Sequence, residues 1–380
     1  MSAPHLLFAS DSFKGTLSSA DTARLLRQAA REILPDARSV SVPMADGGEG
    51  TAEALAAACG GEMVHVTVHG PLGDPVDAAY AQLPGGRAII EMAAAAGITL
   101  VDRAQLDPTR ATTFGVGELI LHAVLRGCSD VTVTLGGSAT NDGGLGMLAA
   151  LGVRLYDETG EEVAGTPSNL GRIATVDPLG LRLALDGIAV HAMCDVDNPL
   201  TGAHGATYTF GPQKGASAEE LDQLEGAMRV WEQTLAATCG YEVGAQPGAG
   251  AAGGLGAACL GLLGADLKPG IDTVLELVGF DDLLAQTDLC VTGEGWLDAQ
   301  TAHGKVIAGV ARACERAGVP CVAIVGGMDA GAEALPGLTA AVPLTCAPMS
   351  LDEALARAEE LYALAARRTF ALFGAGWNVR

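Results

Sequence analysis

The residues of this sequence that can do chemistry are carboxylates, lysines and glycines, and they gather in five short segments. These segments are residues 11–16, 44–51, 136–144, 194–200 and 292–298. Only 18% of the residues are charged, so five acidic or glycine-rich turns indicate a shared cleft. Clustered carboxylates favour a magnesium site, because this ion prefers hard oxygen ligands and phosphate. With Lys14 and Lys214 facing phosphate charge, the set is typical of phosphoryl transfer, in which positioning and charge neutralisation dominate.

The segment 136–146 contains five glycines, and its backbone amides could form an anion-binding nest ahead of a helix. Familiar nucleotide motifs fit this chain poorly. The sequence has no GxxxxGK[ST], since Val306 follows Gly304-Lys305. A GxGxxG pattern begins at Gly248, but Gln246-Pro247 stands where a strand should precede it, which disfavours a dinucleotide site and an oxidoreductase.

The elements that must position these segments alternate between short apolar strands and amphipathic helices. Strands are expected over residues 5–9, 38–43, 130–135, 188–194, 288–291, 320–325 and 338–344. Helices are expected over residues 20–33, 51–59, 113–125, 218–239, 248–263, 299–317 and 351–373. Residues 63–92 contain three β-rich runs separated by turns, which favours hairpins, and residues 202–215 are expected to form a loop. Strand ends that carry polar turns are where open α/β sheets bind ligands.

Length and composition narrow the possible classes. A chain of 380 residues exceeds the size of most single-core domains, so two domains are expected. The change from alternating strands and helices to β-rich runs predicts one domain from residues 1–65 and 281–380 and another from residues 66–280. The formal charge of −23 repels phosphate backbones, so no nucleic-acid partner is expected. The apolar runs are too short for a membrane span or a leader, which predicts a soluble, cytoplasmic protein. Nine cysteines without a CxxC pair indicate reduced thiols rather than a zinc site or disulfides.

Together, the five segments resemble the motif set of type-1 glycerate kinases, in the same order, from Asp11 to about Lys305. The resemblance implies an α/β fold, with a flavodoxin-like doubly wound domain interrupted by a mixed α/β, restriction-enzyme-like insert. It also implies ATP- and Mg²⁺-dependent phosphorylation of D-glycerate, usually to 2-phosphoglycerate. One departure is Trp296, where the family pattern Gly-Glu-Gly-Arg-Leu-Asp has arginine. If that arginine holds phosphate, its replacement should alter the affinity for nucleotide or substrate.

On this basis we expect a reaction in the cleft between the two domains, with roles assigned from residue chemistry. The catalytic residues are expected to be Lys14, Asp46, Asp195 and Lys214. Substrate contacts are expected from Asp11, Ser12, Glu49, Asp197 and Asn198, and magnesium ligands from Glu294 and Asp298. The ATP phosphates are expected on Gly136, Gly137, Ser138, Thr140, Asn141 and Asp142. The alternatives are a glycerate 3-kinase, a kinase or phosphatase for another small hydroxy acid, and a non-catalytic sensor of small acids. The chain is expected to be a monomer or a homodimer.

Overall fold

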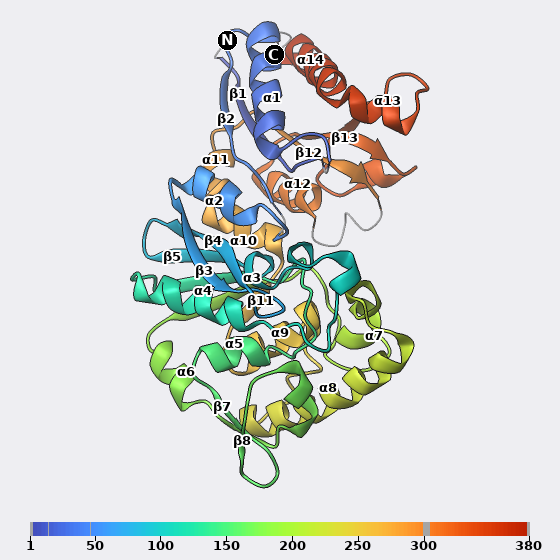
Figure 1. The fold of residues 1–380 in the computed structure, drawn as a ribbon. Helices are drawn as coiled ribbons and strands as arrows, with labels where there is room; N and C mark the ends of the chain where they lie inside the picture. The colour runs from blue at the N-terminus through green and yellow to red at the C-terminus, as the bar shows by residue number, and fades with distance from the viewer. Residues whose placement is uncertain (1–2, 14, 46, 299–304, 378–380) are drawn as a thin grey trace. The chain divides into compact units, whose positions relative to one another are not determined.

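The computed structural model describes residues 3–13, 15–45, 47–298 and 305–377, so Lys14 and Asp46 lie outside the described residues (Figure 1). Two compact units divide the chain. Unit 1 comprises residues 1–46, 57–59 and 270–380, and unit 2 comprises residues 47–56 and 60–269. The expectation that two domains meet near residues 65 and 281 stays a prediction.

Unit 1 is built on a five-stranded, wholly parallel sheet with the order β14-β13-β12-β1-β2. The strands are β1 (His5–Ser10), β2 (Arg38–Ser41), β12 (Leu289–Leu297), β13 (Cys321–Met328) and β14 (Ala340–Pro343). Buried apolar residues of these strands contribute to two clusters, one on each face of the sheet, as expected for a parallel sheet covered on both sides.

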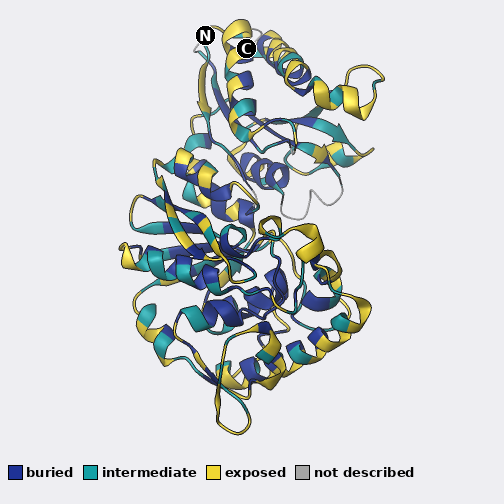
Figure 2. Cartoon of the chain, in the orientation of Figure 1, coloured by how far each residue is buried: buried dark blue, intermediate teal, exposed yellow. Residues whose placement is uncertain are grey.

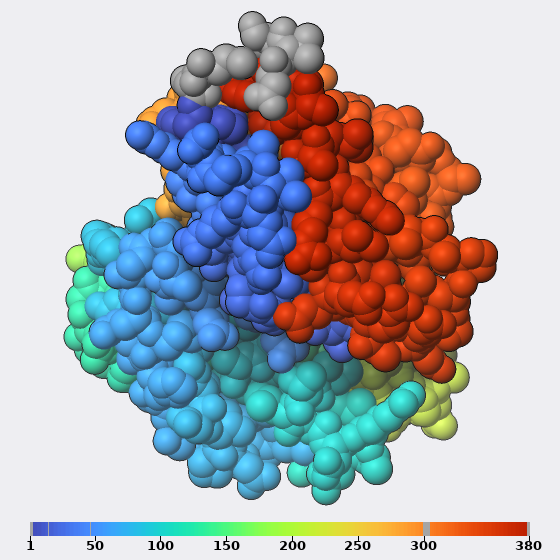
Figure 3. All heavy atoms as spheres, turned by 90° about the horizontal axis from the view of Figure 1, so that it is seen from above, coloured from blue at the N-terminus to red at the C-terminus, as the bar shows by residue number. Residues whose placement is uncertain are grey.

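Helices cover both faces of this sheet. Helix α1 (Ser19–Ile33) and helix α14 (Ala358–Trp377) pack side by side over one face, and Figure 3 shows the beginning and the end of the chain next to each other there. Helix α12 (Val306–Ala317) covers the other face and is buried along most of its length (Figure 2). The remaining helices are α10 (Gly270–Leu277), α11 (Phe280–Leu284) and α13 (Leu351–Ala356).

Unit 2 contains a six-stranded mixed sheet with the order β11-β10-β6-β5-β4-β3. The strands are β3 (Glu62–His69), β4 (Pro75–Leu83), β5 (Arg87–Glu91), β6 (Asp130–Thr134), β10 (Ala189–Met193) and β11 (Asp266–Lys268). The last four are parallel, whereas β3 and β4 add antiparallel hairpins, as the β-rich run predicts. A small antiparallel sheet contains β7 (Arg154–Tyr156), β8 (Glu162–Val163) and β9 (Thr175–Asp177).

The helices of unit 2 surround one apolar core that includes the fully buried Trp231 and Tyr80. They are α2 (Thr51–Cys59), α3 (Ala93–Ala96), α4 (Phe114–Leu125), α5 (Leu145–Ala150), α6 (Leu179–Ala184), α7 (Ala206–Phe210), α8 (Ala218–Cys239) and α9 (Ala251–Gly261). None of the helices in the described part of the chain combines the length and apolar character that crossing a membrane requires.

Five sequence expectations about local structure are wrong. Strand β12 does not end at Val291 but continues to Leu297, and β13 likewise continues to Met328. The reason lies in the facing strand: Trp296 pairs with Gly327, and a Cβ on Gly327 would clash with the Trp296 ring, so the pairing continues because glycine stands opposite the tryptophan. The expected helix over residues 351–373 is two helices, α13 and α14, and the expected loop over residues 202–215 contains α7. The glycine-rich helix expected from residue 248 begins only at α9, which includes a left-handed stretch over residues 252–254.

Candidate functional site

Three neighbouring parallel strands of unit 2 end level with one another. Glu91 on β5 and Met193 on β10 both pair with Thr134 on β6. The segments that follow β6 and β10 therefore begin at the same edge of the sheet, as the sequence predicts for residues 136–144 and 194–200. This edge, formed by the carboxyl ends of parallel strands, is where ligands bind in open α/β sheets.

Only the first part of the segment 136–144 reaches the surface of unit 2. Gly136 and Gly137 are exposed and Ser138 is half-buried. In contrast, Thr140, Asn141 and Asp142 are fully buried. The beginning of the loop is therefore the part that a ligand can reach, whereas the three buried side chains face the protein interior.

Asp142 holds this loop in shape from inside. Its carboxylate accepts hydrogen bonds from the backbone N–H and the hydroxyl of Thr113, both at 2.8 Å, and from the N–H groups of Gly144 and Gly146. Burial raises the pKa of Asp142, and these hydrogen bonds oppose that shift. These contacts give Asp142 a structural role. Its expected contact with the nucleotide stays a prediction.

Lys214 lies beneath the same loop, although it is distant in the sequence. It belongs to the 3₁₀ turn Pro212–Lys214 that follows α7, and only 1% of its surface is exposed. Its ammonium group donates to the Ser138 hydroxyl at 2.8 Å and to the Thr140 carbonyl at 2.6 Å. Burial lowers the pKa of Lys214 to about 7, and the negative charge of Asp142 partly opposes that effect. The expected association of Lys214 with the glycine-rich loop is thus present, with the lysine supporting the loop from below.

A second segment at this edge of unit 2 is held by Glu91, which sequence reasoning missed. The Glu91 carboxylate accepts hydrogen bonds from the N–H groups of Gly50 and Ala52, at 3.3 and 2.8 Å, at the beginning of α2. Burial raises the pKa of Glu91. Glu91 and the exposed Glu49 line a cavity of about 500 Å³ together with Gly136 and Gly137. A carboxylate as the last residue of a buried strand is the signal that could have revealed Glu91.

The residues of the acidic segment after β10 differ in their surroundings. Asp195 and Asp197 are exposed, as substrate-binding residues can be. Asn198 is half-buried, and its side-chain amide donates to the His204 carbonyl at 2.8 Å, so it fixes the following loop.

Unit 1 has its own cavity, of about 810 Å³, at the carboxyl ends of β1, β12 and β13. Asp11 and Ser12 follow β1, and the Asp11 carboxylate accepts from the Ser12 N–H at 2.6 Å. The side chain of Glu294 lies on β12 and is buried. The structure therefore brings the expected Asp11, Ser12 and Glu294 together around one cavity, whose volume is in the range of small-molecule sites.

Two further residues complete this cavity. Lys305 immediately precedes α12 and forms an ion pair of 3.4 Å with Asp298, one of the expected metal ligands. Trp296 lies on the cavity wall with 53% of its surface exposed, and its indole N–H donates to Asp329. Sequence reasoning missed Lys305 as a site residue, because the lysine of a Gly-Lys pair outside a GxxxxGK[ST] pattern gives no motif.

A magnesium ion at the unit 1 cavity would need oxygen ligands from its carboxylates. Asp11, Glu294 and Asp298 supply hard oxygen atoms, which fit this ion. Among the described residues, however, the one group of three potential ligands within 4.8 Å of one another consists of cysteines. A magnesium ion here would accordingly take phosphate oxygens and water as its remaining ligands, which is its usual behaviour.

Comparisons with known proteins agree with this geometry. The sequence model described as "Glycerate kinase family" matches residues 6–374. A "Glycerate 2-kinase" of Escherichia coli is 40% identical over 98% of both chains, and a "Glycerate kinase" of Bacillus subtilis is 42% identical over 95% of this chain and 96% of its own. The crystal structure of "putative glycerate kinase 2" from Salmonella typhimurium LT2 matches with a TM-score of 0.89 and 42% identity, over 99% of this chain and all of that one. This mixed α/β chain belongs to the glycerate kinase family and is an enzyme of the kinase class.

Proposed function

We propose that this enzyme phosphorylates D-glycerate with ATP and Mg²⁺ and releases 2-phosphoglycerate and ADP. The observation that carries the proposal is the 40% identity, over 98% of the chain, to a relative named glycerate 2-kinase. In the reaction the substrate hydroxyl oxygen forms a bond to the γ-phosphorus of ATP. The bond between the γ-phosphorus and the oxygen that bridges to the β-phosphate breaks, and a base accepts the hydroxyl proton. The base is one of Asp46, Asp195 and Asp197, of which the last two are exposed carboxylates after β10.

On the unit 2 side, the exposed amides of Gly136 and Gly137 bind the ATP phosphates, and Ser138 adds its hydroxyl. Lys214 keeps Ser138 and the Thr140 carbonyl in place through its two hydrogen bonds. Glu49 contacts the glycerate hydroxyls from the segment that Glu91 holds. This arrangement relies on positioning, which is the main contribution of protein groups to phosphoryl transfer.

On the unit 1 side, Asp11 and Ser12 contact substrate, and Glu294 and Asp298 hold Mg²⁺ directly or through water. The bound ion supplies positive charge to the transferring phosphoryl group. Lys14 adds a further positive charge there. Residues of both units thus serve one reaction, and its location in an interdomain cleft stays a prediction.

The finer description of the fold is also part of the proposal. The order β14-β13-β12-β1-β2 corresponds to the flavodoxin-like order 2-1-3-4-5, which supports a flavodoxin-like unit 1. We propose that unit 2 is the mixed α/β, restriction-enzyme-like insert. A cytoplasmic location, a monomeric or homodimeric state and the lack of a nucleic-acid partner stay predictions.

Phosphorus NMR of the purified protein with ATP, Mg²⁺ and D-glycerate tests the proposal, since it resolves both turnover and the position of the new ester. We expect a 2-phosphoglycerate signal. A 3-phosphoglycerate signal would make the protein a glycerate 3-kinase. ATP consumption only with another hydroxy acid would change the substrate, and stabilisation by glycerate without any ATP consumption would favour a sensor.

The magnesium assignment has a separate test. Glu294→Ala is expected to raise the Mg²⁺ concentration needed for half-maximal rate by at least about tenfold, as the loss of a metal-site partner commonly does. Glu315→Ala removes an exposed carboxylate of α12 and serves as the matched control. Equal Mg²⁺ dependence in both variants would remove Glu294 from the metal site.

A further inference from the structure

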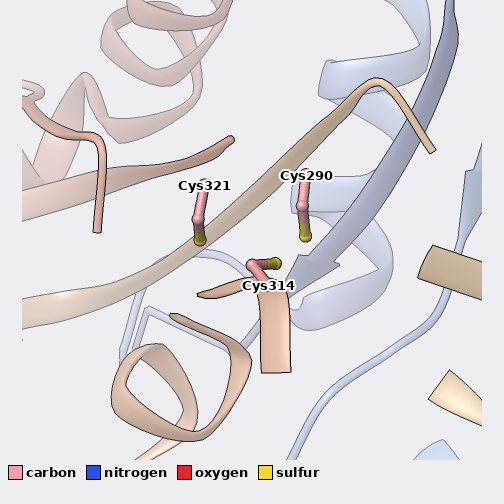
Figure 4. Close-up of side chains that lie close together, drawn as sticks. All are labelled: Cys290, Cys314 and Cys321. Atoms are coloured by element: carbon pink, nitrogen blue, oxygen red, sulfur yellow. The ribbon is translucent and has the colours of Figure 1, made fainter. Parts of the chain in front are cut away.

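Three cysteine thiols converge inside unit 1, away from the residues assigned to catalysis. Cys290 is on β12, Cys321 pairs with it on β13, and Cys314 comes from α12. The three sulfur atoms lie within 4.8 Å of one another, and all three residues are fully buried. Figure 4 shows the three side chains pointing into the same small space from the two strands and the helix.

The spacing of these thiols suits a metal ion at their centre. Metal–thiolate bonds of about 2.3 Å place the three sulfur atoms of a planar trigonal site about 4.0 Å apart. That separation lies within the observed limit of 4.8 Å. The ion would bind without moving the backbone of either strand, since only the side chains need to adjust.

The number and kind of the ligands decide which ion fits. Structural zinc takes four ligands, and within the described residues the group contains three thiols and no fourth His, Cys or carboxylate. Thiolates are soft ligands and select Cu(I) among the ions that such sites take. We propose that Cys290, Cys314 and Cys321 form a three-coordinate thiolate site for Cu(I).

The ion would enter at the beginning of the two strands, where the chain reaches the surface. Cys321 is the first residue of β13, and the exposed Pro320 precedes it. The Pro320 carbonyl accepts from the Cys290 N–H at 3.0 Å, and the Cys314 carbonyl accepts from the Val319 N–H at 2.9 Å. Local opening of the short turn between α12 and β13, which would break these hydrogen bonds, would be needed for entry.

The bound ion would tie α12 to both central strands. Each Cu–S bond that forms replaces one S–H bond and releases one proton, without any change in the oxidation state of copper or sulfur. Glu294 follows Cys290 by four residues on β12, which corresponds to roughly 13 Å along an extended strand. Copper loading is therefore expected to stabilise unit 1 against unfolding and to leave the catalytic rate unchanged.

Anaerobic titration with Cu(I), supplied as its bicinchoninate complex, tests the proposal on the full chain. We expect one equivalent of Cu(I) per chain, and X-ray absorption showing three sulfur ligands at about 2.3 Å. Cys290→Ser, Cys314→Ser and Cys321→Ser should each weaken Cu(I) binding by more than about 100-fold. Loss of a residue that only hydrogen-bonds a metal ligand costs up to about 100-fold, and loss of a ligand itself should cost more. Cys128→Ser and Cys259→Ser, which alter buried thiols of unit 2, should leave binding unchanged.

A measurement on the unmodified chain guards against variants that fail to fold. Alkylation during brief denaturant pulses, followed by mass spectrometry, should show that Cu(I) protects Cys290, Cys314 and Cys321 but not Cys128. Failure to bind Cu(I), equal binding in the three variants, or equal protection of Cys128 would overturn the site. Preferential binding of zinc by the same three thiols would overturn the choice of ion.

Discussion

The ammonium group of Lys214 lies 2.8 Å from the hydroxyl of Ser138, across 76 residues of sequence. This contact, with the second one to the Thr140 carbonyl, ties the turn after α7 to the loop after β6. The loop's exposed amides at Gly136 and Gly137 therefore depend on a side chain that itself has almost no exposure to solvent.

Replacing Lys214 by methionine keeps the apolar stem and removes both hydrogen bonds. We expect kcat/KM for ATP to fall about 100-fold, because a displacement of about 1 Å in a positioning group has that cost. Gln213→Ala changes the exposed neighbour and should leave kcat/KM unchanged. Steady-state kinetics test this prediction, with circular dichroism as a check of folding. Near-normal turnover in Lys214→Met would show that Lys214 does not position the loop for catalysis.

The lowered pKa of Lys214 makes stability depend on pH. Its value of about 7 in the folded chain compares with 10.5 as the ordinary value. Above pH 7 the unfolded chain therefore binds a proton that the folded chain lacks, so the free energy of unfolding rises with pH, by at most about 1.4 kcal/mol per pH unit. Below pH 7 both states hold the proton and this contribution no longer changes.

Urea denaturation of the wild type and of Lys214→Met, over a pH range of about 6 to 9, measures this effect. The difference in unfolding free energy between the two proteins should be constant at the acidic end and should then shift in favour of the wild type. The half-buried Cys194 and the buried Cys259, whose pKa values are raised to about 11 and about 12, are present in both proteins, so their contribution cancels in this difference. A difference that is independent of pH would show that Lys214 titrates normally.

Trp296 offers a test of the unit 1 cavity. Trp296→Arg restores the residue of the family pattern on the cavity wall beside Lys305. A second positive charge there should lower the KM of an anionic ligand, ATP or glycerate, by about twofold to fivefold, since a partly exposed ion pair contributes up to about 1 kcal/mol. Leu372→Arg adds the same charge at an exposed site on α14 and should change neither KM. Unchanged KM values for both ligands in Trp296→Arg would place the ligands away from this wall.

Glu91 should support the segment at the beginning of α2. Glu91→Ala leaves the N–H groups of Gly50 and Ala52 without their acceptor, at a cost of about 1–3 kcal/mol in the free energy of unfolding. Glu91→Gln keeps an acceptor oxygen and should recover part of the stability and of kcat/KM. Glu53→Ala removes an exposed carboxylate from the same helical turn and should have little effect. Equal loss in Glu91→Gln and Glu91→Ala would show that charge, rather than hydrogen bonding, matters.

Local signals allowed much of the fold to be predicted from sequence. Ser18 and Asp21 form the capping box at the beginning of α1, and α2 and α8 have the expected bounds. Strand ends at Thr134 and Met193 were also predictable, because polar turns follow short apolar runs there. Such features depend on neighbours within a few residues, which the sequence shows directly.

Long-range contacts account for what sequence reasoning missed. The support of Gly50 by Glu91 spans 41 residues, and that of Thr113 by Asp142 spans 29. Neither pair follows a periodic pattern, so only the folded chain reveals it. The extension of β12 past Gly293 likewise depends on the facing strand, which accepts tryptophan opposite Gly327.

Unit 1 is assembled from both ends of the chain, which has a consequence for biosynthesis. The Ala9 carbonyl of β1 accepts from the Thr292 hydroxyl across 283 residues, and α1 packs on α14 near the C-terminus. During translation, the continuous stretch of unit 2 emerges before β12 and α14. Strand β1 and helix α1 therefore lack these packing partners until later. Because domains generally fold as they appear, unit 2 can form its core first, while β1 and α1 stay exposed to chaperones until β12 and α14 have been translated.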